Sequence, residues 1–436
     1  MSLIMLRKFL LSCVTVLILP FDTSAENWPG WRGPRGDGTS AAQRFPLQWN
    51  GTNGQNIAWK VAIPGEGHAS PIIFADRIFL VTCLLDSKDR QLICIDRQSG
   101  EILWHKNVFR APLESKHALN SYASGTPVTD GHLVYVAFLE VDGDTVAAPN
   151  VGSNRQITPG KVVVAAFDFD GNQQWKVTPG EFVSAHGFSS CPVLYKELVI
   201  INGDHDGDSY IVALNKSTGE TVWKTKRQNG IRSYVTPLIR EIDGRTQMVV
   251  SGSECIVSFN PDTGTRYWTI DGPTEQFVAS MVFDGHKFYM AAGFPTYHVM
   301  GILPTGKGNV TQSHVAWHAR NAKCYVPSPV IVDDYLIVAD DRGTANCFDT
   351  ASGDRHWQER LGNHYSASLL TAGGLVFLTA DDGTTKIIRP GEELNVIAEN
   401  ELGENCYSSP ALAHNQLFVR GEKHLFCIDG DKLTGE

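Results

Sequence analysis

One motif recurs along the whole chain, and it limits what the chain can fold into. Each copy runs from a small residue before proline, through two apolar strands joined by a polar turn, to an Asp or Asn, a Ser/Thr-Gly pair and a tryptophan. Near-complete copies end at Trp104, Trp223, Trp268 and Trp357, and weaker copies begin at Gly125, Ala279, Ala367 and Ser408. This self-similarity predicts one array of eight similar units rather than several unrelated domains.

The tryptophans measure the length of the unit. Their successive separations are 71, 48, 45, 49 and 40 residues, for Trp104, Trp175, Trp223, Trp268, Trp317 and Trp357. Such spacing suits four short strands with their turns. The strands are apolar runs such as Ile78 to Val81, and the turns carry Asp-Gly or Thr-Gly pairs. With 41 glycines and only 19% charged residues, the composition also favours a turn-rich β protein.

The two ends of the array predict a closed ring. The last unit begins at Ser408, and no tryptophan follows its Asp429-Gly430 turn. A separate apolar strand, residues 56–61, precedes the first unit and contains Trp59. Because this strand can complete the last unit, it would remove the free sheet edges of an open array. The sequence therefore predicts an all-β, eight-bladed β-propeller with four-stranded antiparallel blades, in which the N-terminal strand closes the last blade.

The first 25 residues have the pattern of a secretory signal peptide. Arg7 and Lys8 precede an apolar run at residues 9–19, and a small-residue cleavage site ends at Ala25. An uncleaved anchor is the alternative. We therefore expect a signal peptide at residues 1–25, a Trp/Gly/Pro-rich lead segment at 26–55 and the propeller at 56–436. The mature chain is expected to be exported, periplasmic or secreted, and monomeric, with no membrane-spanning segment.

The charge of the chain excludes two classes of partner. The net charge is −10, and the chain contains no extended run of consecutive Lys or Arg residues. Binding to nucleic acid or to an anionic membrane requires clustered positive charge. We therefore expect neither partner.

The repeat resembles that of the pyrroloquinoline-quinone (PQQ)-like eight-bladed propeller family over residues 56–436. It is similar to the short exported members, including the outer-membrane assembly lipoprotein B group. The opening residues 27–34, Asn-Trp-Pro-Gly-Trp-Arg-Gly-Pro, also resemble the start of exported PQQ-like proteins of environmental bacteria. The resemblance implies that each repeat tryptophan covers the seam between two blades. It implies little about function, because the motif encodes blade packing.

Irregular sequence is expected to gather on one face of the ring. If the first strand of each blade is innermost, the connections between blades share a face with the hairpins between second and third strands. Extra sequence falls there at residues 107–124 and 141–160. A longer stretch at residues 293–309 is expected in the second-to-third and third-to-fourth turns of the fifth blade. Long loops over a scaffold are where a binding site usually lies.

Aromatic and basic residues come just before the innermost strands. We expect them to surround the mouth of the channel, where they either plug it or contact a flat cofactor, a sugar or a peptide. These candidates are His68, Tyr122, His186, Arg232, Tyr234, Tyr325, His364, Tyr365 and Tyr407, with Phe277 at the equivalent place in the fifth blade.

One acidic loop resembles the start of a calcium site. Asp204, Asp206 and Asp208 alternate around Gly207, and calcium prefers convergent oxygen ligands. The twelfth position is Asn215 rather than an acid, however. An acidic hairpin with Asp-Gly turn chemistry explains the same residues.

The cysteines suggest packing rather than chemistry. Cys94, Cys347 and Cys427 share one repeat position, as expected of small buried residues. Cys83 and Cys94, on the two arms of one hairpin, are the one pair that a disulfide could plausibly join. The sequence contains no Cys-x-x-Cys pair for zinc or haem and no His-Glu-x-x-His motif.

Three functions remain open. The favoured one is a non-catalytic binding or scaffolding platform for a protein, a peptide or a glycan, with no cofactor. The alternative is a PQQ- and calcium-dependent dehydrogenase of alcohols or aldose sugars, which the resemblance suggests. The family's dehydrogenases hold the quinone against a flat tryptophan, often beside an adjacent-cysteine disulfide, and this chain lacks both features. A hydrolase or sensor that uses His68, His186, His364 and Asp206 is the third.

The sequence of the lead segment allows two interpretations of its role. Residues 27–38 hold two tryptophans, Arg32 and several glycines. They either staple across a face of the propeller, which we expect, or dock a partner.

Overall fold

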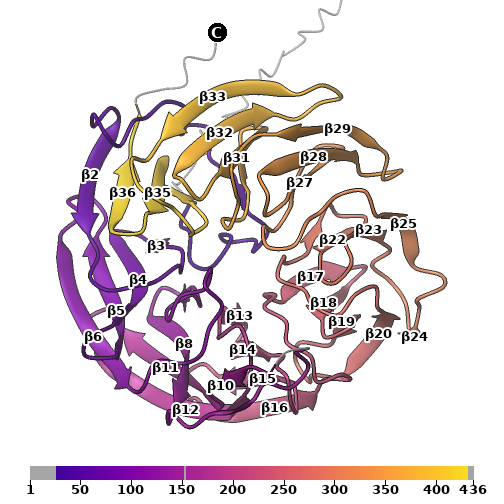
Figure 1. The fold of residues 1–436 in the computed structure, drawn as a ribbon, viewed down its shortest axis with the longest axis horizontal. Helices are drawn as coiled ribbons and strands as arrows, with labels where there is room; N and C mark the ends of the chain where they lie inside the picture. The colour runs from indigo at the N-terminus through magenta and orange to yellow at the C-terminus, as the bar shows by residue number, and fades with distance from the viewer. Residues whose placement is uncertain (1–25, 152–153, 431–436) are drawn as a thin grey trace, which may run out of the picture.

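The computed structural model describes residues 26–151 and 154–430. Eight antiparallel sheets follow one another around a central axis, which confirms the predicted eight-bladed propeller (Figure 1). The described part of the chain contains no helix, and therefore none with the length and apolarity to cross a membrane. The predicted signal peptide, residues 1–25, lies outside the described residues.

The first four blades follow the chain in order. The first contains β3 (Ile72–Phe74), β4 (Arg77–Leu84), β5 (Asp89–Asp96) and β6 (Ile102–Arg110). The second contains β7 (Val128–Thr129), β8 (Leu133–Val141), β11 (Gly160–Asp168) and β12 (Gln173–Phe182), and a small hairpin of β9 (Val146–Ala147) and β10 (Gln156–Ile157) extends from it. The third contains β13 (Val193–Tyr195), β14 (Leu198–Gly203), β15 (Tyr210–Asn215) and β16 (Thr221–Lys226). The fourth contains β17 (Leu238–Ile242), β18 (Arg245–Gly252), β19 (Cys255–Phe259) and β20 (Arg266–Asp271).

The remaining blades continue the ring. The fifth contains β21 (Val282–Phe283), β22 (Phe288–Ala292), β23 (His298–Ile302) and β25 (Val315–Ala319), and β24 (Gly308–Asn309) adds to the edge of the fourth. The sixth contains β26 (Val330–Val332), β27 (Tyr335–Ala339), β28 (Thr344–Asp349) and β29 (Arg355–Arg360). The seventh contains β30 (Leu370–Ala372), β31 (Leu375–Thr379), β32 (Thr384–Arg389) and β33 (Asn395–Glu401), with β1 (Thr39–Ser40) beside β30.

The eighth blade joins the two ends of the chain. It contains β34 (Ala411–Ala413), β35 (Gln416–Arg420) and β36 (His424–Ile428), and its outermost strand is β2 (Ile57–Ala62). Trp59 of β2 lies opposite Cys427 of β36 in an antiparallel register. Figure 1 shows the indigo β2 beside the yellow β36. The predicted closure of the last blade by the N-terminal strand is therefore confirmed.

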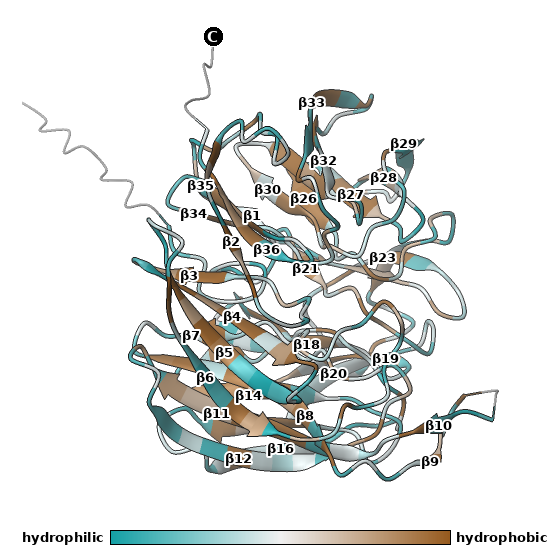
Figure 2. Ribbon diagram, turned by 60° about the vertical axis from the view of Figure 1, so that its left-hand side comes forward, coloured by the Kyte–Doolittle hydropathy of each residue, from teal (hydrophilic) through white to brown (hydrophobic). Residues whose placement is uncertain are grey.

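Burial explains the apolar pattern of each blade. The middle strands, such as β4 and β5, are buried along nearly their whole length. The outermost strands alternate, as in β2, where every second residue is exposed. Figure 2 shows the same contrast, with brown middle strands and teal segments at the rim. Middle strands pack between neighbouring blades on both sides, whereas an outermost strand meets solvent.

The repeat tryptophans join neighbouring blades. The indole nitrogen of Trp104 donates to the carbonyl oxygen of Phe169 in the next blade at 3.0 Å. Equivalent bonds to the next blade start from Trp59, Trp175, Trp223, Trp317 and Trp357. Trp268 departs from this pattern, because its indole donates to Gln247 of its own blade at 2.9 Å. The predicted role at the seams is thus confirmed for six of the seven tryptophans by their hydrogen bonds.

The small residues of the motif form a second ring of contacts. The backbone N–H of Ser70 donates to the Thr126 hydroxyl at 2.9 Å, so one blade reaches the next through a short side chain. The same contact recurs from Thr126 to Cys191, Thr236 to Ser280, Ser280 to Ser328, Ser328 to Ser368 and Ser368 to Ser409. A hydroxyl or thiol before the innermost strand is therefore needed for contact between blades.

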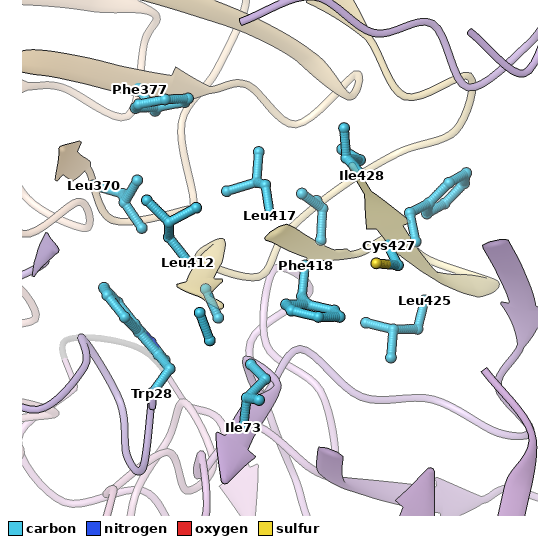
Figure 3. Packing of buried hydrophobic residues seen from close by; sticks show 14 of the residues in the cluster. Trp28, Ile73, Leu370, Phe377, Leu412, Leu417, Phe418, Leu425, Cys427 and Ile428 are labelled. Carbon is cyan, nitrogen blue, oxygen red and sulfur yellow. The ribbon is translucent and has the colours of Figure 1, made fainter. Parts of the chain in front are cut away.

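Residues 26–40, the plug segment, cross one end of the ring. Trp28 exchanges both backbone hydrogen bonds with Ile73 of the first blade, and its ring is 1% exposed. Figure 3 shows this ring close to Leu370 and Leu412, residues of the same apolar cluster. The carbonyl of Pro29 accepts from Thr129 in the second blade at 2.8 Å. The first turn of the plug segment thus holds four blades together.

The rest of the plug segment reaches the opposite side of the ring. Arg240 of the fourth blade donates to the Asp37 carboxylate at 2.8 Å. The buried Arg32 donates to the carbonyl of Pro329 at the sixth blade at 2.6 Å, and the carbonyl of Gly38 accepts from Thr371 of the seventh. Of the two interpretations of this segment, the structure therefore confirms that it staples the blades together across one face of the propeller.

Candidate functional site

The two faces of the ring differ in the loops they carry. The loop-rich face consists of the connections between blades and the hairpins between second and third strands. The plug face carries the other turns and the plug segment. Backbone hydrogen bonds join the loops of the loop-rich face to one another, as from the N–H of Cys406 to the carbonyl of Asp381. They also join the turns of the plug face, as from the N–H of Arg97 to the carbonyl of Asp76. The predicted sorting of loops between the two faces is confirmed.

Both predicted insertions shape the loop-rich face. Asn150, in the loop between β9 and β10, donates to the carbonyl of Gly230 at 2.8 Å, so the insertion of the second blade reaches the third-to-fourth connection. The backbone N–H of Ser115 donates to Thr158, which ties the first-to-second connection to the same insertion. The longer stretch of the fifth blade lies where it was expected, but its third-to-fourth connection runs along the rim, where β24 pairs with β20.

Several of the predicted side chains pair around the mouth of the ring. The rings of His68 and Tyr407 lie 4.7 Å apart, and those of His186 and Tyr234 are stacked at 6.1 Å. The Tyr325 hydroxyl donates to Gln276, and Tyr122 packs against Lys116. The first three pairs join neighbouring connections, whereas Tyr122 and Lys116 belong to the same first-to-second connection. They form a half-buried aromatic lining rather than a single stack.

Two of the predicted aromatic residues lie elsewhere. Tyr365 is 1% exposed and belongs to the apolar cluster between the sixth and seventh blades. Phe277 is fully buried in the cluster of the fourth and fifth blades. Each ring joins an apolar cluster between two blades, and burial of a large aromatic ring is favourable. The structure therefore corrects their expected place at the mouth.

Arg232 is the buried cation of this face. Its guanidinium donates to both oxygens of Asp206, at 2.9 and 3.0 Å, and to the carbonyl of Asn150 at 3.3 Å. Burial raises the pKa of Asp206, although the Arg232 guanidinium opposes this effect. The Nε of Arg232 is buried without a hydrogen-bond partner in the described structure. This residue therefore ties the second-blade insertion to the third-blade hairpin.

The three carboxylates of the acidic loop point to three different cations. Asp204 is fully buried and bonds Arg227 at 2.8 Å, while Asp206 bonds Arg232. Asp208 is exposed and bonds Lys226 at 2.8 Å. Among residues 26–151 and 154–430, no three His, Cys, Asp or Glu side chains are grouped to hold a metal ion. Calcium binding here stays a prediction, and it would have to displace these ion pairs.

His364 has an acidic partner that the sequence reasoning missed. Its Nδ1 lies 2.7 Å from Asp381, and the same carboxylate oxygen accepts from the Ser366 hydroxyl at 3.0 Å. Serine therefore bonds the acid and not the imidazole, which is the wrong order for an activated nucleophile. The signal was present in the repeated Ala-Asp-Asp of the sixth and seventh hairpins, at Ala339 and Ala380.

The other two histidines of the hydrolase hypothesis are neutral at physiological pH. Burial, with Arg420 and Lys116 nearby, lowers the pKa of His68 to about 3. Burial, with Arg232 nearby, lowers the pKa of His186 to about 4. Asp206 is held by Arg232 and contacts neither ring in the described structure. The four predicted acid–base groups are therefore not brought together.

The one plausible disulfide, between Cys83 and Cys94, does not form. The hairpin register places Cys83 opposite Arg90 and Cys94 opposite Phe79. All eight described cysteines are free and buried. Cys94, Cys347 and Cys427 each lie opposite the tryptophan of their own blade, which confirms that they fill small buried positions.

The residues at the mouth do not fit the quinone that the resemblance suggests. A flat tryptophan is the expected platform, but the repeat tryptophans lie in outermost strands. The acids predicted to bind calcium are engaged by two arginines and a lysine, and no two described cysteines are bonded to each other. We derive no reaction through the quinone.

Solved structures share the fold at low identity. BamB from Moraxella catarrhalis is 14% identical with a TM-score of 0.58, covering 87% of this chain and 99% of that one. A europium-containing methanol dehydrogenase is 12% identical with a TM-score of 0.57, covering 92% and 90%. The quinohemoprotein alcohol dehydrogenase of Comamonas testosteroni is 10% identical with a TM-score of 0.52, covering 94% and 82%. At these identities the likeness establishes the fold alone.

Comparison by sequence gives the family. No curated protein matches this chain significantly. One family model, PQQ_2, described as outer membrane protein assembly factor BamB, matches residues 47–148, 141–293 and 309–389. These matches cover most of the propeller, so the chain belongs to the PQQ_2 family.

Proposed function

We propose that this chain is an exported, monomeric and non-catalytic platform whose loop-rich face binds a protein, a peptide or a glycan. The observation that carries the proposal is the difference between the two faces. The chain's own plug segment crosses one end of the ring, whereas the other end carries the insertions and the half-buried aromatic lining. A face left open on a rigid scaffold is where binding is expected.

The chemistry of the open face supports binding rather than catalysis. The buried acids Asp204 and Asp206 are paired with arginines, and burial lowers the pKa values of His68 and His186. Four large apolar side chains are exposed in its loops: Leu85, Leu119, Val146 and Phe294. Apolar groups at the rim of a polar surface favour contact with a partner.

The family model and the BamB structure are the comparisons that favour this function. The printed description of the model is an assembly factor of the outer membrane. A role beside other proteins outside the cytoplasm would agree with the predicted signal peptide.

The test uses variants on the two faces. We would alter Tyr234, Tyr325 and Tyr407 together to Ala and recover bound molecules from the exported fraction by native mass spectrometry. The matched control alters Tyr195 and Tyr335 of the plug face. The proposal expects the first variant to lose its partner and the control to retain it. Equal retention by both variants, with unchanged thermal unfolding, would contradict the proposal.

The alternative function is a PQQ- and calcium-dependent dehydrogenase of alcohols or aldose sugars. Its support is the fold shared with the two dehydrogenases. Purified protein would be incubated with PQQ and calcium, and quinone absorbance and dye reduction would be recorded with alcohols and sugars. Retained absorbance together with turnover would favour this alternative over the binding platform.

A further inference from the structure

A cavity of about 200 Å³ opens on the loop-rich face where the ring closes. Its walls come from the eighth-to-first, first-to-second and seventh-to-eighth connections and include His68, Lys116 and Tyr407. This volume is below the ~300–1,000 Å³ of sites for drug-sized ligands. The cavity therefore has room for a single ring or side chain rather than for a large cofactor.

One wall of the cavity is an aromatic surface. The His68 and Tyr407 rings lie 4.7 Å apart with their planes inclined by 33°. His68 is neutral, because burial lowers the pKa of the imidazole to about 3. A pair of neutral rings favours a ligand that presents an apolar face.

The charges around the cavity balance. Two carboxylates, Glu66 and Glu422, line it, and Lys116 lies 3.3 Å from Glu66. The second cation is Arg420, which is buried below Gly67 and bonds the carbonyl oxygens of Ala69 and Val81. Two positive and two negative groups leave no net attraction for an ion. The balance favours a neutral ligand.

The cavity offers hydrogen-bond acceptors to that ligand. The Glu422 carboxylate has one hydrogen bond among the described residues, a long contact of 3.5 Å from Asn405. Oε1 of Glu66 is buried and makes no hydrogen bond in the described structure, although Lys116 is close. A ligand hydroxyl would give Oε1 of Glu66 the hydrogen bond it lacks, since a buried acceptor without a partner is costly. The Glu422 carboxylate is exposed and has free acceptor capacity for a second hydroxyl.

We propose that this cavity binds one pyranose ring of a neutral glycan, with an apolar face of the sugar against Tyr407 and its hydroxyls toward Glu66 and Glu422. The inference rests on the proposed function and names a ligand class for part of the same face. A sugar ring combines an apolar face with hydroxyl edges, which matches a cavity that combines an aromatic wall with carboxylates.

The experiment is saturation-transfer NMR on the full chain with glucose, galactose, mannose and N-acetylglucosamine. Tyr407→Ala removes the aromatic wall, and Glu422→Gln removes an acceptor while it preserves the shape. The matched controls are Tyr335→Ala on the plug face and Glu393→Gln in a distant turn. Thermal unfolding checks that each variant is folded, and Glu422→Gln keeps the test valid if Tyr407→Ala unfolds the protein.

The expected result is transfer from the ring protons of at least one sugar, with affinity about tenfold lower in Tyr407→Ala, as for loss of a stacked ring. The two controls should bind as the parent does. No transfer from any of the four sugars would overturn the inference, and so would transfer that neither variant changes.

Failure of this inference differs from failure of the proposed function. A chain that retains its partner in the variant test but gives no sugar signal disproves the sugar site alone. A signal from a lysine-containing tripeptide in place of the sugars would assign the cavity to a peptide and would also overturn it.

Discussion

The indole nitrogen of Trp59 lies 2.9 Å from the carbonyl oxygen of Arg97, and this hydrogen bond joins the last blade to the first. Trp59 comes from the N-terminal strand of the propeller, so the bond lies where the ring closes. Stability of the whole ring should depend on this seam, since the last and first blades share one apolar cluster that an open ring would expose.

Replacing Trp59 tests the closure. We expect Trp59→Phe to lower the free energy of unfolding by about 1 kcal/mol, because it removes one hydrogen bond. Trp59→Ala should cost about 3 kcal/mol, since the packing is lost as well. Leu103→Ala, on an exposed part of the neighbouring outer strand, is the control and should change the value by less than about 0.5 kcal/mol. Equal effects of Trp59→Ala and Leu103→Ala in guanidinium unfolding would contradict the closure account.

The glycine of the repeat tests the same seam from the other side. Gly100 has a φ of +75°, and a Cβ there would lie 2.7 Å from the Trp59 ring. Gly244 has a φ of +72° with open space around it. Gly244→Ala should therefore cost about 1 kcal/mol for the left-handed backbone, and Gly100→Ala clearly more. Similar unfolding free energies for the two variants would show that the contact with Trp59 does not matter.

Trp28 tests the plug segment. Its ring is buried among residues of the first, seventh and eighth blades, whereas Trp31 in the same segment is only half-buried. We expect Trp28→Ala to destabilise the protein by about 3–5 kcal/mol, as for large buried side chains. Trp31→Ala should cost less than half as much. If the two variants unfold at the same denaturant concentration, the plug segment is not part of the cooperative fold.

His68 gives a pH prediction. Its pKa is about 3 in the folded protein and near 6.5 when unfolded. Between these values the unfolded chain binds a proton that the folded chain does not, so stability is complete above pH 6.5 and falls as the pH is lowered.

His68→Gln isolates this contribution. The midpoint of thermal unfolding should fall less for the variant than for the parent between about pH 7.5 and about pH 5. The readout is the difference in unfolding midpoint between parent and variant at each pH. Comparing the two proteins removes the contribution of Asp206, whose raised pKa makes stability fall as the pH rises. Parallel pH profiles would mean that His68 is not buried as described.

The fold was predictable from the sequence because the motif carries its own packing. Gly100 and Trp59 are separated by 41 residues, yet each is a standard part of a repeat, so their contact follows from repetition. Trp268 is buried in the apolar cluster shared by the fourth and fifth blades, as a seam residue should be, but its indole bonds Gln247 of its own blade. That hydrogen bond could not be foreseen from the repeat, because Gln247 is not part of the motif.

The site was less predictable, because its pairs come from different blades and have no fixed spacing. His68 and Tyr407 were each expected at the mouth, but their contact depends on how the ring closes. Tyr365 packs into the apolar cluster between the sixth and seventh blades, which only the packed blades define. Cys83 and Cys94 are on one hairpin, but the register pairs them with Arg90 and Phe79. Glu422 lies in a short turn, where a local acid is usual and carries no signal by itself. Asp381 belongs to the Ala-Asp-Asp that recurs at Ala339 and Ala380, and this repetition was its only signal.

The central claim is that partners bind at the loop-rich face. The most direct test places a photoreactive phenylalanine analogue at position 325 or 407 of the protein in its own cells, and at 195 or 335 as plug-face controls. The account predicts a specific cross-linked product from the first two positions and none from the controls. Cross-linking from positions 195 and 335 but not from 325 and 407 would contradict it.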